Sequence, residues 1–274
     1  MSDPYHTDEH NGPPSLSASV AKILLEHSAL HAWYAHPRLN KAYQSEEKVE
    51  FDYGTAVHAL LLEGSEAKLV IVEADDWRTK AAREARDAAR AAGQTPLLAR
   101  QLSKVRAMVF AARAAVEASE LRGIFTAGEP ERVTRWIDNG VHCRAKFDWL
   151  PSDQRMILDY KTAVSAEPEA FSRQIASLGY GIQASFYQRG AKAEFGHEPA
   201  FILLAQEKEP PYACTLHGIA PSMKEICDAK VERAIKLWGE CLSANKWPGY
   251  DNRVHWAEAT AWQMAEHEQS LGAS

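Results

Sequence analysis

The sequence predicts a single α/β domain, with a mixed central sheet flanked by helices and additional helices toward the N-terminus. Its 274 residues are 46% hydrophobic and 25% charged, which matches ordinary globular domains and suffices for one sizeable core. Apolar residues recur at helical spacing up to about residue 119, and from Arg132 they recur at the spacing of strands. A later helical stretch followed by two strand-like segments completes an alternation that is typical of α/β proteins.

Composition divides the chain into three parts. Residues 1–14 are polar and contain several prolines, and we expect them to be a flexible leader. Residues 15–250 form the single domain, which comprises a helical part over 15–119 and an α/β core over 120–247. Residues 251–274 are a polar, Trp-containing C-terminal tail to which the sequence assigns no structure.

The chain lacks the patterns of a targeted or membrane protein. It begins with no basic segment followed by an apolar run, and no stretch approaches the roughly 20 apolar residues that span a bilayer. We therefore expect a cytoplasmic protein with no membrane contact. The cysteines lie far apart, without the paired spacing of zinc or iron-sulfur ligands, and are expected to be reduced and structural: Cys143, Cys214, Cys227 and Cys241.

Two helices are expected in the first quarter of the chain. Ser17 or Ser19 can cap the first, which runs to about His36. The second fits residues 52–63 and ends at Gly64, because glycine readily adopts the left-handed conformation common at helix C-termini.

A basic segment follows, although the net charge of −6 argues against a protein coated in positive charge. Residues 78–119 are rich in Ala and Arg, and Gly93 with Pro96 divides them into two helices. Between Arg78 and Arg113, only Glu84 and Asp87 oppose the basic residues, which are Arg78, Lys80, Arg83, Arg86, Arg90, Arg100, Lys104, Arg106 and Arg113. Such a segment is either a solvated helix face or a surface that contacts phosphate groups.

Strands begin near Arg132, where RVTRWID and VHCRAKFDWL flank Asn139-Gly140. This dipeptide between two alternating apolar runs is a strong signal for a tight β-hairpin. A third strand, RMILDYKTA, follows a turn at residues 151–154.

Helical spacing returns after the third strand. Glu167-Pro168 opens a helix that is expected to run to about Phe195. Its apolar stripe should face the sheet and consists of Phe171, Ile175, Leu178, Ile182 and Phe186. Two further strands, AFILLAQEK and YACTLHGIA, come next, and residues 222–246 form a closing helix.

Chemistry concentrates at the third strand. Side chains alternate along a strand, so Asp159 and Lys161 face the same way, and pairing with the preceding strand can bring Asp148 beside Asp159. Two carboxylates and an ammonium are the groups that phosphodiester hydrolysis needs. The carboxylates hold Mg²⁺, and lysine orients water or stabilises negative charge on the phosphate. The alternative is a surface ion pair on an edge strand.

These residues carry a family resemblance. The ordered set resembles the RecB-type branch of the PD-(D/E)XK nuclease superfamily, and within it the RecE-like, exonuclease VIII family, over roughly residues 15–250. The set comprises His58 in GTAVHALLLEG, Asp148 in the WIDNGVHCRAKFDWL hairpin, Asp159-Tyr160-Lys161 in MILDYKTA, and Gln183 and Tyr187 in YGIQASFYQ. The proline of the superfamily name is absent, since Phe147 precedes Asp148, but that position varies within the superfamily.

The resemblance implies a restriction-endonuclease-like core and a role for each matched residue. Lys161 would be the catalytic lysine. Mg²⁺, with Mn²⁺ as a substitute, would be bound by His58, Asp148, Asp159 and the backbone carbonyl of Tyr160. Without the family, His58 would be read as an ordinary helix histidine.

Further residues are weaker candidates. The family places Gln183 and Tyr187 near the metal and the DNA strand, whereas the residues alone indicate only a polar spot on a helix face. Glu131, just before the hairpin, is either another acid near the metals or a solvated glutamate at the entry of a strand. In its functional interpretation, the basic segment forms a phosphate-contacting arch in which Arg83 and Arg86 bind DNA.

The resemblance implies an activity as well. It predicts a bacterial or phage-encoded, Mg²⁺-dependent exonuclease that degrades linear double-stranded DNA from 5′ to 3′ and leaves single-stranded overhangs for recombination. A RecT-like single-strand annealing protein would be its partner, and the chain would form a homo-oligomer such as a tetramer. The alternatives are a repair or Cas4-like nuclease of the same branch, or a non-catalytic DNA-binding protein on the same fold. The scattered cysteines argue against the iron-sulfur cluster common in Cas4-like relatives.

Overall fold

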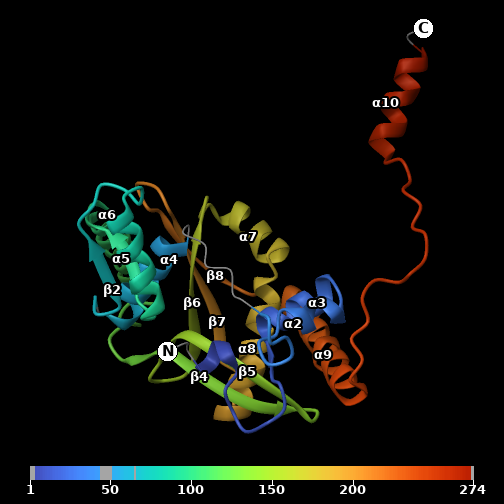
Figure 1. The fold of residues 1–274 in the computed structure, drawn as a ribbon, viewed down its shortest axis with the longest axis horizontal. Helices are drawn as coiled ribbons and strands as arrows, with labels where there is room; N and C mark the ends of the chain where they lie inside the picture. Colours follow the sequence, from blue (N-terminus) through green and yellow to red (C-terminus); the bar gives the residue numbers. More distant parts are fainter. Residues whose placement is uncertain (1–3, 44–50, 65, 273–274) are drawn as a thin grey trace.

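A mixed sheet forms the centre of the protein (Figure 1). The computed structural model describes residues 4–43, 51–64 and 66–272. Within these residues the strands of the main sheet lie in the order β1 (Leu16–Ser17), β5 (Val141–Pro151), β6 (Met156–Ala163), β7 (Ala200–Glu207) and β8 (Cys214–Gly218), with β4 (Gly128–Asp138) along the other edge of β5. Strands β6 and β7 are parallel, whereas β5 is antiparallel to β4 and β6. The predicted mixed sheet is confirmed.

The β4–β5 hairpin forms where the sequence predicts it. Asn139 and Gly140 have φ of 49° and 79°, and Asp138 pairs with Val141 across the turn. Positive φ at both central residues is the requirement of a type I′ turn, whose twist matches that of the strands. The turn therefore fixes the register that places Glu131 opposite Asp148.

Helices cover both faces of the sheet and bury a hydrophobic core on each (Figure 1). One face carries α2 (Ala18–Glu26), α3 (Ala29–Tyr34), α7 (Pro168–Ser177), α8 (Tyr180–Phe195) and α9 (Pro221–Ala244). The other carries α4 (Phe51–His58), a π-helical segment η1 (Ala59–Glu63) and α6 (Ala99–Glu117). Along β6, Ile157 contributes to the first core, whereas Leu158 and Tyr160 contribute to the second. This alternation leaves Asp159 and Lys161 on the face of α7 and α8.

The predicted helix from Ser17 to His36 is two helices. The Ser17 side chain caps α2, as expected, by accepting a hydrogen bond of 3.4 Å from Val20 N. Prediction of a single helix is wrong because the Ser28 hydroxyl caps a new helix, α3, by accepting from His31 N. Serine competes in this way with continued helical hydrogen bonding.

The predicted helix from Glu167 to Phe195 is also divided. Glu167 caps α7 and Pro168 occupies its first turn, as expected. The chain then turns at Gly179, which has a φ of 69° and separates α7 from α8. Leu178, expected to face the sheet, is instead 43% exposed because it lies at this break. The turn starts α8 at Tyr180, beside the site described below.

The helix expected over residues 52–63 is present, with a change of winding in its middle. Helix α4 passes into η1 directly after His58, and Gly64, with a φ of 65°, ends it as expected. Short π segments within α-helices are frequent at functional sites.

The segment before residue 119 also contains strands that were not anticipated. Helices α5 (Lys80–Ala91) and α6 confirm the two predicted helices. Strands β2 (Leu69–Val72), before α5, and β3 (Thr95–Leu98), between α5 and α6, form a separate parallel pair. Pro96, taken as a helix divider, lies within β3, which is possible because the described residues place a partner on only one edge of that strand.

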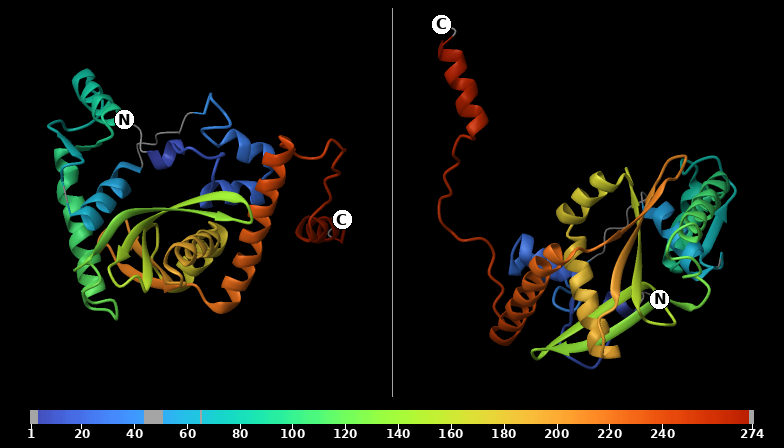
Figure 2. Two further views of the ribbon diagram at one scale, coloured as in Figure 1. Left: turned by 90° about the horizontal axis from the view of Figure 1, so that it is seen from below. Right: turned by 180° about the vertical axis from the view of Figure 1, so that it is seen from behind.

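The C-terminal part ends in an isolated helix. Helix α9 confirms the predicted closing helix, and Asn245, with a φ of 45°, ends it. Helix α10 (Ala261–Gly272) lies apart from the sheet in the further views of Figure 2. Within the described part of the chain, no helix has the length and apolar character needed to cross a membrane.

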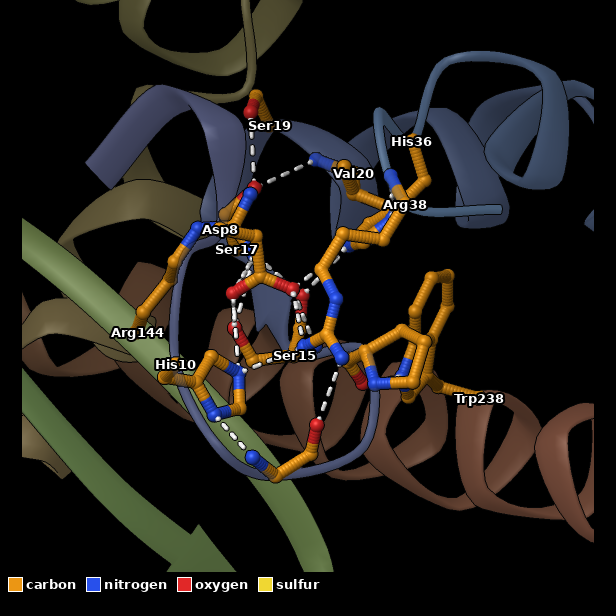
Figure 3. A network of polar contacts seen from close by, with 12 residues as sticks. Asp8, His10, Ser15, Ser17, Ser19, Val20, His36, Arg38, Arg144 and Trp238 are labelled. Atoms are coloured by element: carbon orange, nitrogen blue, oxygen red, sulfur yellow. Dashed lines mark hydrogen bonds and ion pairs between the residues drawn. The ribbon is translucent and has the colours of Figure 1, made fainter. Parts of the chain in front are cut away.

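The N-terminal residues differ from the expected flexible leader. Residues 1–3 lie outside the described residues, but a short helix α1 (Pro4–Thr7) precedes Asp8, which is fully buried (Figure 3). The Asp8 carboxylate accepts hydrogen bonds from the backbone and hydroxyl of Ser15 and lies 3.0 Å from Arg144 Nη1 on β5. A buried charge is stable only when it is paired and hydrogen-bonded. These contacts therefore fasten the N-terminal segment to the sheet.

His36 completes this buried network as a neutral imidazole (Figure 3). Its Nε2 donates to the Ser15 carbonyl at 3.0 Å, and its Nδ1 accepts from Arg38 N at 3.3 Å. A proton on Nδ1 would oppose the Arg38 N–H. Burial, followed by the positive charge of Arg144, lowers the pKa of His36 to about 4.

We expect this histidine to make the protein sensitive to mild acid. The pKa of an unfolded histidine is about 6.5, so between that pH and about 4 the unfolded chain binds the proton more readily than the folded one. Stability present above pH 6.5 is then lost as the pH falls toward 4, by up to roughly 1.4 kcal/mol per pH unit. Melting temperatures measured from pH 7.5 to 5 would show this slope.

A matched pair of variants isolates the effect. His36→Gln retains a donor for the Ser15 carbonyl but cannot titrate, so its melting temperature should fall less over this range. His197→Gln, at an exposed histidine that bonds the Gln154 carbonyl, should keep the wild-type slope. Equal slopes in both variants would contradict the assignment.

Candidate metal centre

A cavity of about 520 Å³ opens at the point where the two halves of the domain meet. Helix α4 forms one side, strands β4, β5 and β6 form the floor, and the start of α8 closes the other side. The lining residues are His6, Gly54, Thr55, His58, Glu131, Lys146, Asp148, Tyr160, Lys161, Thr162, Tyr180 and Lys208. Five of the residues predicted to form the site therefore line one cavity: His58, Glu131, Asp148, Tyr160 and Lys161.

An interruption of the strand ladders shapes the cavity floor. Strands β4 and β5 pair at Pro130–Trp149 and Arg132–Phe147, which leaves Glu131 and Asp148 opposite each other without a ladder pairing. Glu131 has a φ of 54°, which is uncommon for a residue other than glycine and is found preferentially at functional sites. The interruption turns two carboxylates toward the cavity.

Asp148 also replaces part of the ladder between β5 and β6. Its Oδ2 accepts a hydrogen bond of 2.9 Å from Tyr160 N, so the carboxylate takes the place of a strand carbonyl. Burial disfavours the charge of Asp148, but the hydrogen bond from His58 and the positive charges of His58 and Lys161 hold its pKa below the ordinary value. Asp148 is therefore an ionised carboxylate held in a fixed position.

His58 faces both of these acids from the last position of α4. Its Nε2 lies 3.2 Å from Asp148 Oδ2 and 3.4 Å from Glu131 Oε1. Burial alone would lower the pKa of His58, but the hydrogen bond to Asp148 and the two carboxylate charges raise it overall. The ligand-type atoms of His58, Glu131 and Asp148 lie within 4.8 Å of one another.

These three residues fit a divalent metal ion. Two carboxylates and an imidazole nitrogen converge on one point, and hard carboxylate oxygens are the preferred ligands of Mg²⁺ and Mn²⁺. A proton on His58 Nε2 bonds Asp148 here, whereas a metal would take the nitrogen lone pair in its place. Glu131, one of the weaker sequence candidates, is thus grouped with His58 and Asp148.

Asp159 lies next to this group but is held differently. Its side chain is 0% exposed, its Oδ2 accepts a 2.7 Å hydrogen bond from Gln183 Nε2, and its Oδ1 forms an ion pair with Lys161. Burial, together with the negative charge of Asp148, raises the pKa of Asp159 to about 6. Because β6 lies between β5 and β7, the alternative of a surface ion pair on an edge strand is wrong.

Lys161 remains cationic beside these acids. Burial would lower the pKa of its ammonium, but the charges of Asp159 and Asp148 raise it above the ordinary value. Its Nζ also lies 5.3 Å from the centre of the Tyr180 ring, within the range of a cation–π contact. Lys161 is therefore a fixed positive charge at the edge of the cavity.

Several residues of the cavity were missed by the sequence analysis, among them Lys146 and Tyr180. Lys146 forms an ion pair with Glu131, and Tyr180 lies against Lys161. Lys146 could have been found, because it stands two residues before Asp148 on the same strand and therefore on the same face. Tyr180 could not, because its position depends on the break at Gly179.

The structure keeps the predicted pair together on α8, where a hydrogen bond joins the side chains of Gln183 and Tyr187. Gln183 bonds Asp159, in keeping with a position beside the acids. Tyr187 is only 7% exposed and its ring packs between Phe147 and Phe201, at centroid distances of 5.4 and 6.0 Å. The Tyr187 ring therefore packs against the sheet, and its contact with DNA stays a prediction.

The structure does not bring Arg83 or Arg86 into this cavity. Arg83 is exposed on α5, and Arg86 bonds Asp87 and lies 6.0 Å from the Trp77 ring. Other cations of the basic segment form ion pairs with nearby acids: Lys80 with Glu84, Lys104 with Glu209, and Arg106 with Glu66. The segment is consequently less positive than its sequence indicates.

The chain is similar to proteins of known structure. The chain is similar to a candidate exonuclease from Eubacterium rectale, at 14% identity and a TM-score of 0.63, over 96% of this chain and 97% of that one. A phage-related exonuclease from Haemophilus somnus 129PT also matches, at 14% identity and a TM-score of 0.32, over 69% of this chain and 95% of that one. No curated protein matches.

A family model covers most of the chain. It matches residues 17–260, a span that contains the acids, the histidine and the lysine of the cavity, and it describes a PDDEXK-like domain of unknown function (DUF3799). The fold agrees with this description, since a mixed sheet flanked by helices carries Asp148, Asp159 and Lys161 on adjacent strands. The chain belongs to this PDDEXK-like family of the PD-(D/E)XK nuclease superfamily.

Proposed function

We propose that the protein is a divalent-metal-dependent deoxyribonuclease that degrades linear double-stranded DNA from its ends. One observation supports this most strongly: the ligand atoms of His58, Glu131 and Asp148 lie within 4.8 Å of one another, beside the Asp159–Lys161 pair. A non-catalytic DNA-binding protein would not need to keep the acids Glu131 and Asp148 together with the buried Asp159 carboxylate and a lysine.

The residues of the cavity would have different roles in hydrolysis. His58, Glu131, Asp148 and Asp159 would hold Mg²⁺ or Mn²⁺ together with the Tyr160 carbonyl, and such an ion supplies polarisation of the phosphate and acidification of water. Lys161 supplies a fixed positive charge for the attacking water or for the additional negative charge on phosphorus. Gln183 fixes the orientation of Asp159, and the backbone of Tyr160 fixes that of Asp148.

Substrate and partners follow from the RecE-like motifs. We infer digestion from 5′ to 3′, overhangs for recombination, and cooperation with a RecT-like annealing protein. A homo-oligomer, such as a tetramer around a DNA channel, would gather the exposed Arg83 side chains and the Arg86 side chains on α5. An acidic protein with a net charge of −6 binds DNA best through such an enclosed basic surface.

Removing any one of the proposed ligands should weaken metal binding. Asp148→Asn, Asp159→Asn and His58→Ala should each weaken Mn²⁺ affinity in calorimetry and stop cleavage, because each loses a ligand or its charge. Asp153→Asn, at an exposed acid in the β5–β6 turn, should behave as wild type. Unchanged affinity and activity in purified Asp148→Asn would refute the metal centre.

Removing the Lys161 ammonium should lower the cleavage rate without changing the affinity for metal. Lys161→Met should retain Mn²⁺ affinity but lower the single-turnover cleavage rate by about 10² to 10³, as is typical for loss of one transition-state donor. Lys236→Met, at an exposed lysine on α9, serves as the control. A Lys161→Met enzyme with the wild-type rate would show that this ammonium takes no part in the reaction.

End-labelled linear duplex and covalently closed circular DNA distinguish the proposed exonuclease from other nucleases. We expect Mg²⁺-dependent degradation of the linear DNA only, with release of the 5′ label first and a steep fall in rate as salt increases. Rapid cutting of closed circles would contradict the requirement for an end. Release of the 3′ label first would contradict the polarity and favour the repair-type alternative.

A further inference from the structure

A second cavity, of about 450 Å³, lies directly beside the metal centre. Gly54, Thr162 and Lys208 line both cavities, so the two share this rim. A Cβ placed on Gly54 would lie 3.5 Å from Thr162 Oγ1, which shows how closely α4 approaches β6 there. The absence of a side chain at Gly54 keeps the rim between the cavities low.

Aromatic and aliphatic side chains make the interior of this second cavity. Tyr53 and Trp77 are both half-buried, and Leu98 and Met108 are buried beneath them. Each ring also lies near a cation. Lys104 Nζ is 5.3 Å from the centre of the Tyr53 ring. Arg86 Cζ is 6.0 Å from the Trp77 ring. The walls therefore combine flat π surfaces with cations.

The charges around the cavity are mixed. Arg100, Lys104 and Lys208 contribute positive charge, while Asp76 and Glu209 contribute negative charge, and Lys104 lies 2.8 Å from Glu209. Such a balance does not suit a phosphate in the interior. It suits a neutral, planar ligand with polar edges, and its remaining cations suit phosphates at the rim.

We propose that this second cavity binds an unpaired nucleobase of the DNA strand whose backbone passes through the metal centre, with Trp77 and Tyr53 as stacking surfaces. The occupant is single-stranded, because a base inside a duplex has both its faces and its pairing edge occupied. This inference rests on the proposed nuclease function, since that function places the strand at the shared rim. It assigns Trp77 and Tyr53 to the binding of substrate, apart from the metal ligands.

The decisive experiment compares two strands of equal charge without catalysis. In the presence of chelator, binding of fluorescein-labelled dT12 is measured beside a twelve-nucleotide strand of abasic residues. The wild type should bind dT12 on the order of tenfold more tightly, the size expected for loss of one stacked base. Equal affinities for the two strands would overturn the base site.

Substitutions at Trp77 and Tyr53 test whether the second cavity causes the preference for dT12 over the abasic strand. Trp77→Ala should bring the affinity ratio close to one, Trp77→Phe should largely restore it, and Tyr53→Ala should lower it in part. Trp256→Ala, at an exposed tryptophan of the C-terminal tail, should retain the full ratio. A full ratio in both Trp77→Ala and Tyr53→Ala, with wild-type circular dichroism, would overturn the assignment to this cavity.

The same measurements separate this inference from the proposed function. An active nuclease that binds dT12 and the abasic strand equally would refute the base site and leave the metal centre standing. A wild type without cleavage on any DNA, but with a dT12 preference that depends on Trp77, would refute the nuclease and retain the base site.

Discussion

The arrangement of this protein depends on one buried carboxylate in the middle of its sheet. Asp159 has no access to water, and an ionised group in that position is stable only with charged or hydrogen-bonding partners around it. Lys161 supplies the charge from the same strand, and Gln183 supplies a hydrogen bond from α8. The turn at Gly179 starts α8 at Tyr180 and so allows Gln183 to reach this carboxylate.

The sequence predicted the parts of the fold and site that rest on local rules. The hairpin depends on two residues with positive φ, and the shared face of Asp159 and Lys161 depends on strand alternation alone. The parallel β2–β3 pair was missed because four-residue strands have too little periodicity to detect. The break at Ser28 was missed because a hydroxyl cap and a helical position look alike in sequence.

For the site residues too, the features that depend on contacts between distant parts of the chain could not be predicted from local patterns. His58 and Asp148, close in space, are 90 positions apart, and only the family motif pointed to their proximity. The grouping of Glu131 with them depends on a ladder interruption that no local pattern predicts. Helical spacing showed that Tyr187 shares a side of α8 with Gln183, but not that its ring packs against Phe147 and Phe201.

The change of winding after His58 has a consequence for insertions and deletions in this family. A π segment holds one residue more per turn than the α-helix around it. Loss of one residue between Ala59 and Glu63 can therefore be absorbed by conversion of η1 to α-helix, with both of its ends left in place. Helix α4 has no extra residue of this kind. Loss of one residue between Phe51 and His58 would therefore turn the histidine by about 100° around the helix axis, away from the acids.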